Sequence, residues 1–180
     1  MRDGVVRPID DDLVLEQLDR ALPEVYGYLL HRCRSKAVAE DLTSETFLAA
    51  VTSIRQGTLN DPSTAWLIGV ARHKLSDHWR REARQERHLA AVAEREVVAN
   101  DPFDEAEPGR GMYVLSSLNP MQRAALVLRH VDGLPVPSVA DLLGRSITAT
   151  ETLLARARAA FRHRYQADAL LPGNELETES

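Results

Sequence analysis

The stretch Leu115–Phe161, LSSLNPMQRAALVLRHVDGLPVPSVADLLGRSITATETLLARARAAF, carries the capping and turn signals that decide the fold of this 180-residue chain. Asn119 is a favoured helix N-cap, Pro120 suits the first helical position, and Gln122 stands three residues after the cap. These residues predict a helix that starts at Pro120. The dipeptide Asp132-Gly133 predicts the turn that ends it.

A second, shorter helix is expected over residues 137–143, and Gly144 is expected to end it in a tight turn. The last helix is predicted to begin near Ser146 or Thr148, with Thr148 and Glu151 as a capping box. A short helix, a glycine-containing turn and a long basic helix are typical of a helix-turn-helix, which predicts DNA binding. The short helix is expected to turn Val139 and Leu142 inward.

Two further helices are expected before residue 57. Pro23 interrupts the apolar stripe of the first one and predicts a kink or a fresh helix start. The second is expected from Lys36 to about Ile54. Cys33 is expected to be a small buried hydrophobe rather than a nucleophile. Spacings of three and four residues assign to the first stripe Leu15, Leu18, Leu22, Val25, Leu29 and Cys33.

The segment Gly57–Ser63, GTLNDPS, has the composition of a loop, and Ser63 is able to cap the following helix. That helix is predicted to run from Thr64 to about Arg87. Aromatic and basic residues together suit unpaired bases and a single-stranded backbone. Trp79 is expected in the core, whereas Trp66 is left open between core and surface. The apolar face is predicted to hold Leu67, Ala71, Leu75 and Trp79, and the opposite face Trp66, His73, Asp77, Arg80 and Arg84.

The net charge of −5, from 22 basic and 27 acidic residues, conceals two basic segments. Residues 63–88 hold six basic and three acidic side chains, and residues 112–165 hold seven and three. The rest of the chain is acidic. Two basic segments predict two anion-binding surfaces. One cysteine, and no apolar run approaching ~18 residues, argue against disulfide-rich, secreted and membrane-inserted classes, so a cytoplasmic location is expected.

No catalytic or metal-binding pattern is found, so we expect no enzymatic activity, no metal site and no cofactor. His73 and His78 are five residues apart, unlike the histidines of an HExxH motif. The GRG of residues 109–111 lacks the strand and the GKS/T ending of a phosphate-binding loop. Asp41 and Glu45 share a helix face, and an acidic patch that faces solvent or a partner is the simpler interpretation.

Two stretches taken together resemble a known family. AEDLTSETFLAA (Ala39–Ala50) and AWLIGVARHKLSDHWRREAR (Ala65–Arg84) resemble region 2 of bacterial RNA polymerase sigma factors of the extracytoplasmic-function (ECF) group of the sigma-70 family. Leu115–Phe161 is similar to their region 4. The resemblance implies an all-α fold of two small helical domains, a region 2 bundle and a region 4 helix-turn-helix, joined by a flexible linker.

The implied domain limits are residues 8–90 for region 2, 91–113 for an acidic linker and 114–165 for region 4. Residues 166–180 are expected to form an acidic, disordered tail. The resemblance implies a sigma factor that binds core RNA polymerase, at the clamp helices of the largest subunit and the flap region, and directs promoter-specific initiation. Promoter DNA is the second implied partner, and an anti-sigma factor is a further candidate.

The resemblance also assigns three sets of site residues. The loop 57–63 is implied to join the second set, where a flipped base is taken up. Core-polymerase binding is implied for Asp41, Leu42, Glu45, Thr46 and Phe47; minus-ten DNA binding for Arg72, His73, Asp77, Arg80, Arg81 and Arg84; and minus-thirty-five DNA binding for Arg145, Ser146, Thr148, Ala149, Glu151, Thr152, Arg156 and Arg158.

Three positions depart from the pattern of the family. Ser44 stands where the docking motif often has Gln, and Glu151 and Leu153 replace usual basic residues. A glutamate repels phosphate but accepts a hydrogen bond from cytosine N4, so a different minus-thirty-five sequence is expected. The alternative is a stand-alone helix-turn-helix regulator with an N-terminal dimerisation or sensing domain. A DNA-binding enzyme is a weaker alternative because no active site is found.

Overall fold

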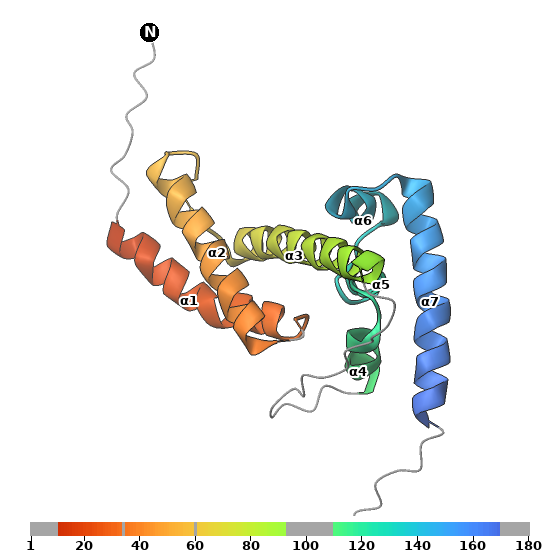
Figure 1. The fold of residues 1–180 in the computed structure, drawn as a ribbon. Helices are drawn as coiled ribbons and strands as arrows, with labels where there is room; N and C mark the ends of the chain where they lie inside the picture. The colour runs from red at the N-terminus through yellow and green to blue at the C-terminus, as the bar shows by residue number, and fades with distance from the viewer. Residues whose placement is uncertain (1–10, 34, 60, 93–109, 170–180) are drawn as a thin grey trace, which may run out of the picture. The chain divides into compact units, whose positions relative to one another are not determined.

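The structure is a computed structural model that describes residues 11–33, 35–59, 61–92 and 110–169, and these ranges contain helices and turns but no strand (Figure 1). The all-α prediction is therefore confirmed. None of the helices in these ranges has both the length and the apolar character needed to cross a bilayer. The elements are α1 (Asp11–Leu30), α2 (Lys36–Arg55), α3 (Thr64–Val92), α4 (Arg110–Ser117), α5 (Pro120–Leu126), the π-helix η1 (Val127–Val131), α6 (Val136–Leu143) and α7 (Ile147–Ala169).

The chain divides into two compact units, and the division falls after His78, inside α3. The first unit holds α1, α2 and the start of α3, and the second holds the rest of α3 with α4–α7. The predicted domain limits at residues 90 and 114 rest on the sequence and stay a proposal. The predicted linker falls mostly on residues 93–109, and the predicted tail mostly on 170–180, both outside the described residues.

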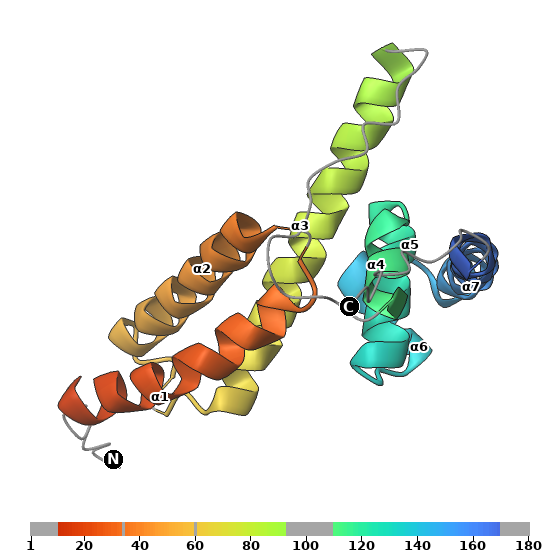
Figure 2. The same cartoon turned by 90° about the horizontal axis from the view of Figure 1, so that it is seen from below.

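In the first unit α1 and α2 lie side by side and run in opposite directions (Figure 2). The predicted α1 stripe is wrong at two positions, since Leu15 and Leu22 are 59% and 45% exposed. Ala21 is buried instead, and its short side chain suits close contact between helices. The alternative of a fresh helix start is also wrong, because Pro23 lies inside an uninterrupted α1. The buried residues of this region are Val14, Leu18, Ala21, Val25, Leu29 and Cys33.

Helix α2 confirms the predicted range to within one residue, and four of its six buried residues are alanine or threonine. Four hydroxyl groups donate hydrogen bonds to the carbonyl four residues earlier, at 2.7–3.0 Å. This satisfies the buried donors of Thr43 and Thr46 within the helix itself. The donors and acceptors are Thr43 to Ala39, Ser44 to Glu40, Thr46 to Leu42, and Thr52 to Leu48.

Helix α3 begins as predicted and ends five residues later than predicted, at Val92. The Ser63 hydroxyl accepts a hydrogen bond from the Trp66 amide at 3.3 Å, as expected of a cap. Trp79 is 1% exposed, which confirms it as a core residue. Trp66 is half-buried, so the structure gives it a place at the edge of the core.

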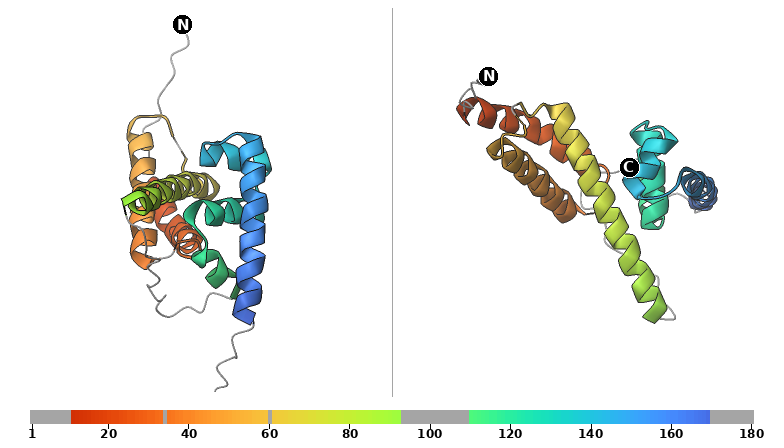
Figure 3. Two further views of the ribbon diagram at one scale, coloured as in Figure 1. Left: turned by 45° about the vertical axis from the view of Figure 1, so that its right-hand side comes forward. Right: turned by 90° about the horizontal axis from the view of Figure 1, so that it is seen from above.

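In the second unit α7 packs along α4, α5 and α6 (Figure 3). The caps confirm the helix-turn-helix reading: the Asn119 carboxamide oxygen accepts from the Gln122 amide at 2.9 Å, and Gly144 ends α6 with φ +63°. The predicted Thr148–Glu151 capping box is wrong. Ser146 caps α7 instead, because its hydroxyl accepts from the Ala149 amide at 3.2 Å and Thr148 is already helical.

The short π-helix η1 continues α5 toward the turn. The Asp132 amide donates to the Val127 carbonyl, and the Arg129 guanidinium donates to the Leu134 carbonyl, both at 2.9 Å. Gly133 has φ +70°, a conformation that favours glycine, which explains the Asp-Gly turn predicted here.

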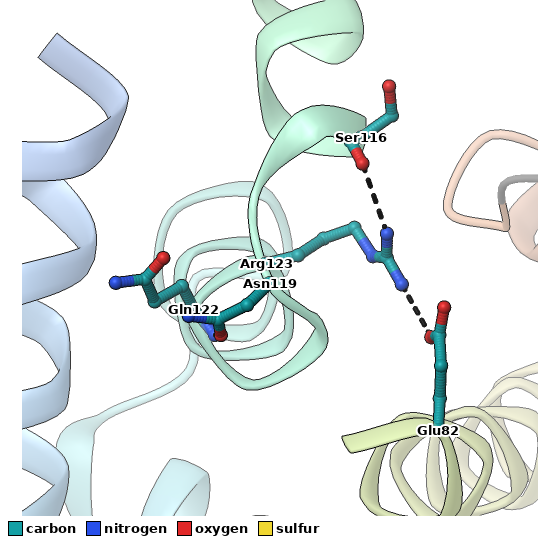
Figure 4. A network of polar contacts seen from close by, with 5 residues as sticks. All are labelled: Glu82, Ser116, Asn119, Gln122 and Arg123. Carbon is teal, nitrogen blue, oxygen red and sulfur yellow. Dashed lines mark hydrogen bonds and ion pairs between the residues drawn. The ribbon is translucent and has the colours of Figure 1, made fainter. Parts of the chain in front are cut away.

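One arginine of the second unit is almost fully buried. Arg123 on α5 is 3% exposed, and its Nη2 lies 2.6 Å from a carboxylate oxygen of Glu82 on α3 (Figure 4). Its Nη1 donates to the Ser116 carbonyl at 3.3 Å. A buried guanidinium needs such partners, because removing its charge from water costs on the order of several kcal/mol. An opposite charge and hydrogen bonds compensate for that cost.

Candidate polymerase and nucleic-acid interfaces

Helix α2 separates the five predicted docking residues into exposed and buried ones. Asp41 is exposed and Glu45 is half-buried, with its side chain 35% exposed. Leu42 and Thr46 are 1% and 0% exposed, so they support the helix from inside rather than offering a surface. Phe47 is half-buried. A partner can therefore reach the two acids and part of Phe47 directly.

An apolar residue that the sequence reasoning missed stands beside these acids. Leu48 is 67% exposed, and the spacing of 41, 44, 45 and 48 places it on one helix face with the acids. We call Asp41, Ser44, Glu45 and Leu48 the docking face. The signal was present in the sequence, because an apolar residue at i+7 from an exposed acid cannot lie on the buried side.

A shallow hollow of about 380 Å³ adjoins the docking face between α1 and α2. Half-exposed Leu22 and Tyr26 of α1 line it together with Ser44 of the docking face. An apolar hollow beside exposed acids suits a partner that presents both an aliphatic and a basic group.

The docking face is tied to α3 by one ion pair. Lys74 Nζ lies 3.2 Å from Glu45 Oε2, and the two side chains are 34% and 35% exposed. Both residues belong to the first unit. No sequence pattern indicated this contact, because the two residues are 29 positions apart on different helices.

The predicted minus-ten residues follow one surface of α3. His73, Arg81 and Arg84 are exposed, and Asp77 and Arg80 are half-buried. At about 100° per residue these five fall on one side of the helix, whereas Arg72 falls on its flank. We call His73, Asp77, Arg80, Arg81 and Arg84 the α3 face. Its length and charge suit the backbone of an extended strand.

The first turns of α7 present the predicted minus-thirty-five residues to solvent. All eight are exposed except Ala149, which is half-buried. The other side of the helix is held in the core by Thr150, Leu154 and Ala157, which are at most 2% exposed. A helix that exposes short polar side chains and a carboxylate at its N-terminal end is suited to reading base edges in a major groove.

Among the described residues, no three His, Cys, Asp or Glu side chains gather closely enough to hold a metal ion. The candidate interfaces are two polar surfaces, on α3 and α7, and one acidic–apolar surface, on α2.

Two family models match the chain. The model described as Sigma-70 region 2 matches residues 18–85, and the model described as Sigma-70, region 4, matches residues 112–161. The first match contains the docking face and the α3 face, and the second contains α5, η1, α6 and α7 as far as Phe161.

Curated relatives of this chain are named RNA polymerase sigma factors. The ECF RNA polymerase sigma factor BldN of Streptomyces coelicolor is 34% identical over 145 residues, which cover 77% of this chain and 55% of that relative's length. The RNA polymerase sigma factor CarQ of Myxococcus xanthus is 31% identical over 133 residues, covering 71% of this chain and 74% of CarQ.

A solved structure supports the fold. The sigma factor RpoE from Bartonella quintana, crystallised with the anti-sigma factor NepR, aligns with a TM-score of 0.52 at 20% identity. The alignment covers 88% of this chain and 99% of that one.

Proposed function

The chain belongs to the sigma-70 family of RNA polymerase sigma factors, in its ECF group, and from this premise we propose that it binds core polymerase and directs initiation at specific promoters. The observation that carries the proposal is the presence of regions 2 and 4, in that order, each with an exposed polar surface on its principal helix. In this role the protein acts as an initiation factor rather than as an enzyme, in the cytoplasm where polymerase works.

The docking face is the proposed contact with the clamp helices of the largest polymerase subunit. Asp41 and Glu45 offer carboxylates to basic residues of the partner, and Leu48 adds apolar area at the centre of the contact. Leu42 and Thr46 hold α2 in place from the core. The flap region is the proposed contact of the second unit.

The α3 face and the loop 57–63 are proposed to bind the melted minus-ten strand. The exposed arginines contact phosphates, and half-buried Trp66 lies near the loop end of the same helix, where an unpaired base is able to stack. The first turns of α7 are proposed to read the minus-thirty-five element in the duplex. The two roles differ because a helix fits the major groove, whereas unpaired bases need a pocket beside a positive surface.

An anti-sigma factor is the proposed inhibitory partner. RpoE of Bartonella quintana was crystallised with such a factor. In this chain the exposed Leu22 and Leu48 beside the acids give an inhibitor an apolar surface to cover.

Copurification with core polymerase, followed by run-off transcription on genomic fragments, tests the proposal. We expect a stoichiometric complex and promoter-dependent transcripts. Asp41→Arg should weaken the complex at least tenfold at matched salt, because like charges then face each other. Glu16→Arg on α1 is the control, since it reverses an exposed acid outside the docking face. Operator binding without any complex with core would favour the stand-alone regulator instead.

A further inference from the structure

The ion pair between Glu45 and Lys74 joins the docking face to the helix that carries the α3 face. Lys74 Nζ lies 3.2 Å from Glu45 Oε2, and about a third of each side chain is exposed to solvent. Pairs of this kind contribute little net stability, so they exchange partners readily when a better one arrives.

Lys74 also borders the α3 face. It follows His73 and precedes Arg81 by seven residues, which is close to two helical turns. Lys74 and Arg81 therefore lie on the same side of α3. In the isolated chain the Lys74 charge is matched by Glu45, although its position would extend the basic surface by one cation.

We propose that Lys74 exchanges partners when the chain binds polymerase. Glu45 then pairs with a basic residue of the polymerase, and Lys74 contacts a phosphate of the melted strand. This inference rests on the proposed function of the docking face and the α3 face. Because polymerase and Lys74 compete for one carboxylate, core binding and strand binding each favour the other, as linkage requires.

The first experiment measures core affinity. Lys74→Met keeps most of the side-chain length and removes the competing charge. It should bind core polymerase about two- to fivefold more tightly than wild type, the range expected for an exposed pair. Lys74→Arg keeps the charge and should show no gain. In the Glu45→Gln background the effect of Lys74→Met should disappear, because the carboxylate that it frees is absent.

The second experiment measures binding of a fluorescein-labelled single-stranded oligonucleotide with the non-template minus-ten sequence. In the isolated chain, Glu45→Gln releases Lys74 and should steepen the slope of log K against log salt by about 0.7, one phosphate contact on a single strand. In the holoenzyme, Lys74→Met should make the slope shallower by about the same amount. Asp41→Asn, which removes a charge from the same helix without touching Lys74, should leave the slope unchanged.

Two results would overturn the exchange. If Lys74→Met weakens core binding, Lys74 orients Glu45 for docking and does not compete with polymerase. If neither variant changes the salt slope, Lys74 makes no phosphate contact. Wild-type chain that forms no complex with core would instead refute the proposed function, so the two failures are distinguishable.

Discussion

Breaking the Glu82–Arg123 pair from its two ends should have very different consequences for the stability of the second unit. Glu82→Ala leaves a guanidinium that is 3% exposed without its carboxylate at 2.6 Å. Removing one partner of a buried pair costs about 3–5 kcal/mol. Arg123→Met instead removes the buried charge and fills most of its volume, and the carboxylate of Glu82, whose side chain is 25% exposed, keeps access to water. That change should lie within about 1 kcal/mol of neutral.

Urea unfolding measures both effects. Trp79, at the start of the second unit and 1% exposed, reports on this unit by fluorescence when Trp66→Phe removes the other tryptophan. With a urea m-value of about 1–3 kcal/mol/M, Glu82→Ala should lower the midpoint by roughly 1 M or more. The double variant Glu82→Ala/Arg123→Met should recover most of that loss. An unchanged m-value and circular dichroism spectrum confirm that the native fold is compared.

The reasoning is refuted if Arg123→Met destabilises as much as Glu82→Ala. The attraction between the Arg123 guanidinium and the Glu82 carboxylate would then exceed the free-energy cost of burying the guanidinium. A neutral Glu82→Ala would show that the Arg123 charge is hydrated in solution despite its burial in the structure.

Four other variants test the recognition surfaces, the turn and helix α1. Glu151→Ala should change the affinity ratio between the preferred base and the other bases about tenfold at one or two upstream positions. A scan of minus-thirty-five variants with holoenzyme measures this ratio. Replacing Arg80 and Arg81 with Gln should lower the salt slope of minus-ten strand binding by about 1.4 and reduce permanganate reactivity of promoter thymines, while leaving upstream preferences intact. Gly144→Ala should lower the free energy of unfolding by about 1–2 kcal/mol, because φ at this residue is +63°. Gly27→Ala inside α1 should raise it by up to ~1 kcal/mol, because nothing lies within 4 Å of the added Cβ. Thermal unfolding measures both changes.

Local chemistry made most of the helix-turn-helix predictable. Asn119 and Gly144 act through hydrogen bonds and backbone angles within a few residues of themselves, so their signals survive without tertiary information. Of the two predicted starts of the last helix, the one at Ser146 is confirmed, and only the Thr148–Glu151 capping box is wrong. Ser146 lies two residues after the glycine, and the helix starts as soon as the turn ends.

Tertiary contacts account for what the sequence did not reveal. The predicted α1 stripe includes the exposed Leu22 and omits the buried Ala21, because spacing alone does not show that close helix packing selects the smaller residue. Glu45–Lys74 and Glu82–Arg123 join residues 29 and 41 positions apart, and no periodicity encodes such pairs. The spacing of Asp41 and Glu45 predicted a shared helix face, whereas their docking role comes from the family resemblance and stays a proposal; their exposed apolar neighbour Leu48 was not recognised.

The hydroxyl groups of α2 affect what it costs to dehydrate this helix. Ser44, on the docking face, donates its proton to the Glu40 carbonyl at 3.0 Å, and Thr52, also exposed, donates to Leu48 in the same way. A partner that displaces water here therefore strands no hydroxyl proton and does not need to supply an acceptor for one. A glutamine at position 44 would bring two amide protons that a partner must satisfy. Because of Ser44, this surface is able to bind partners that offer no hydrogen-bond acceptor at this position.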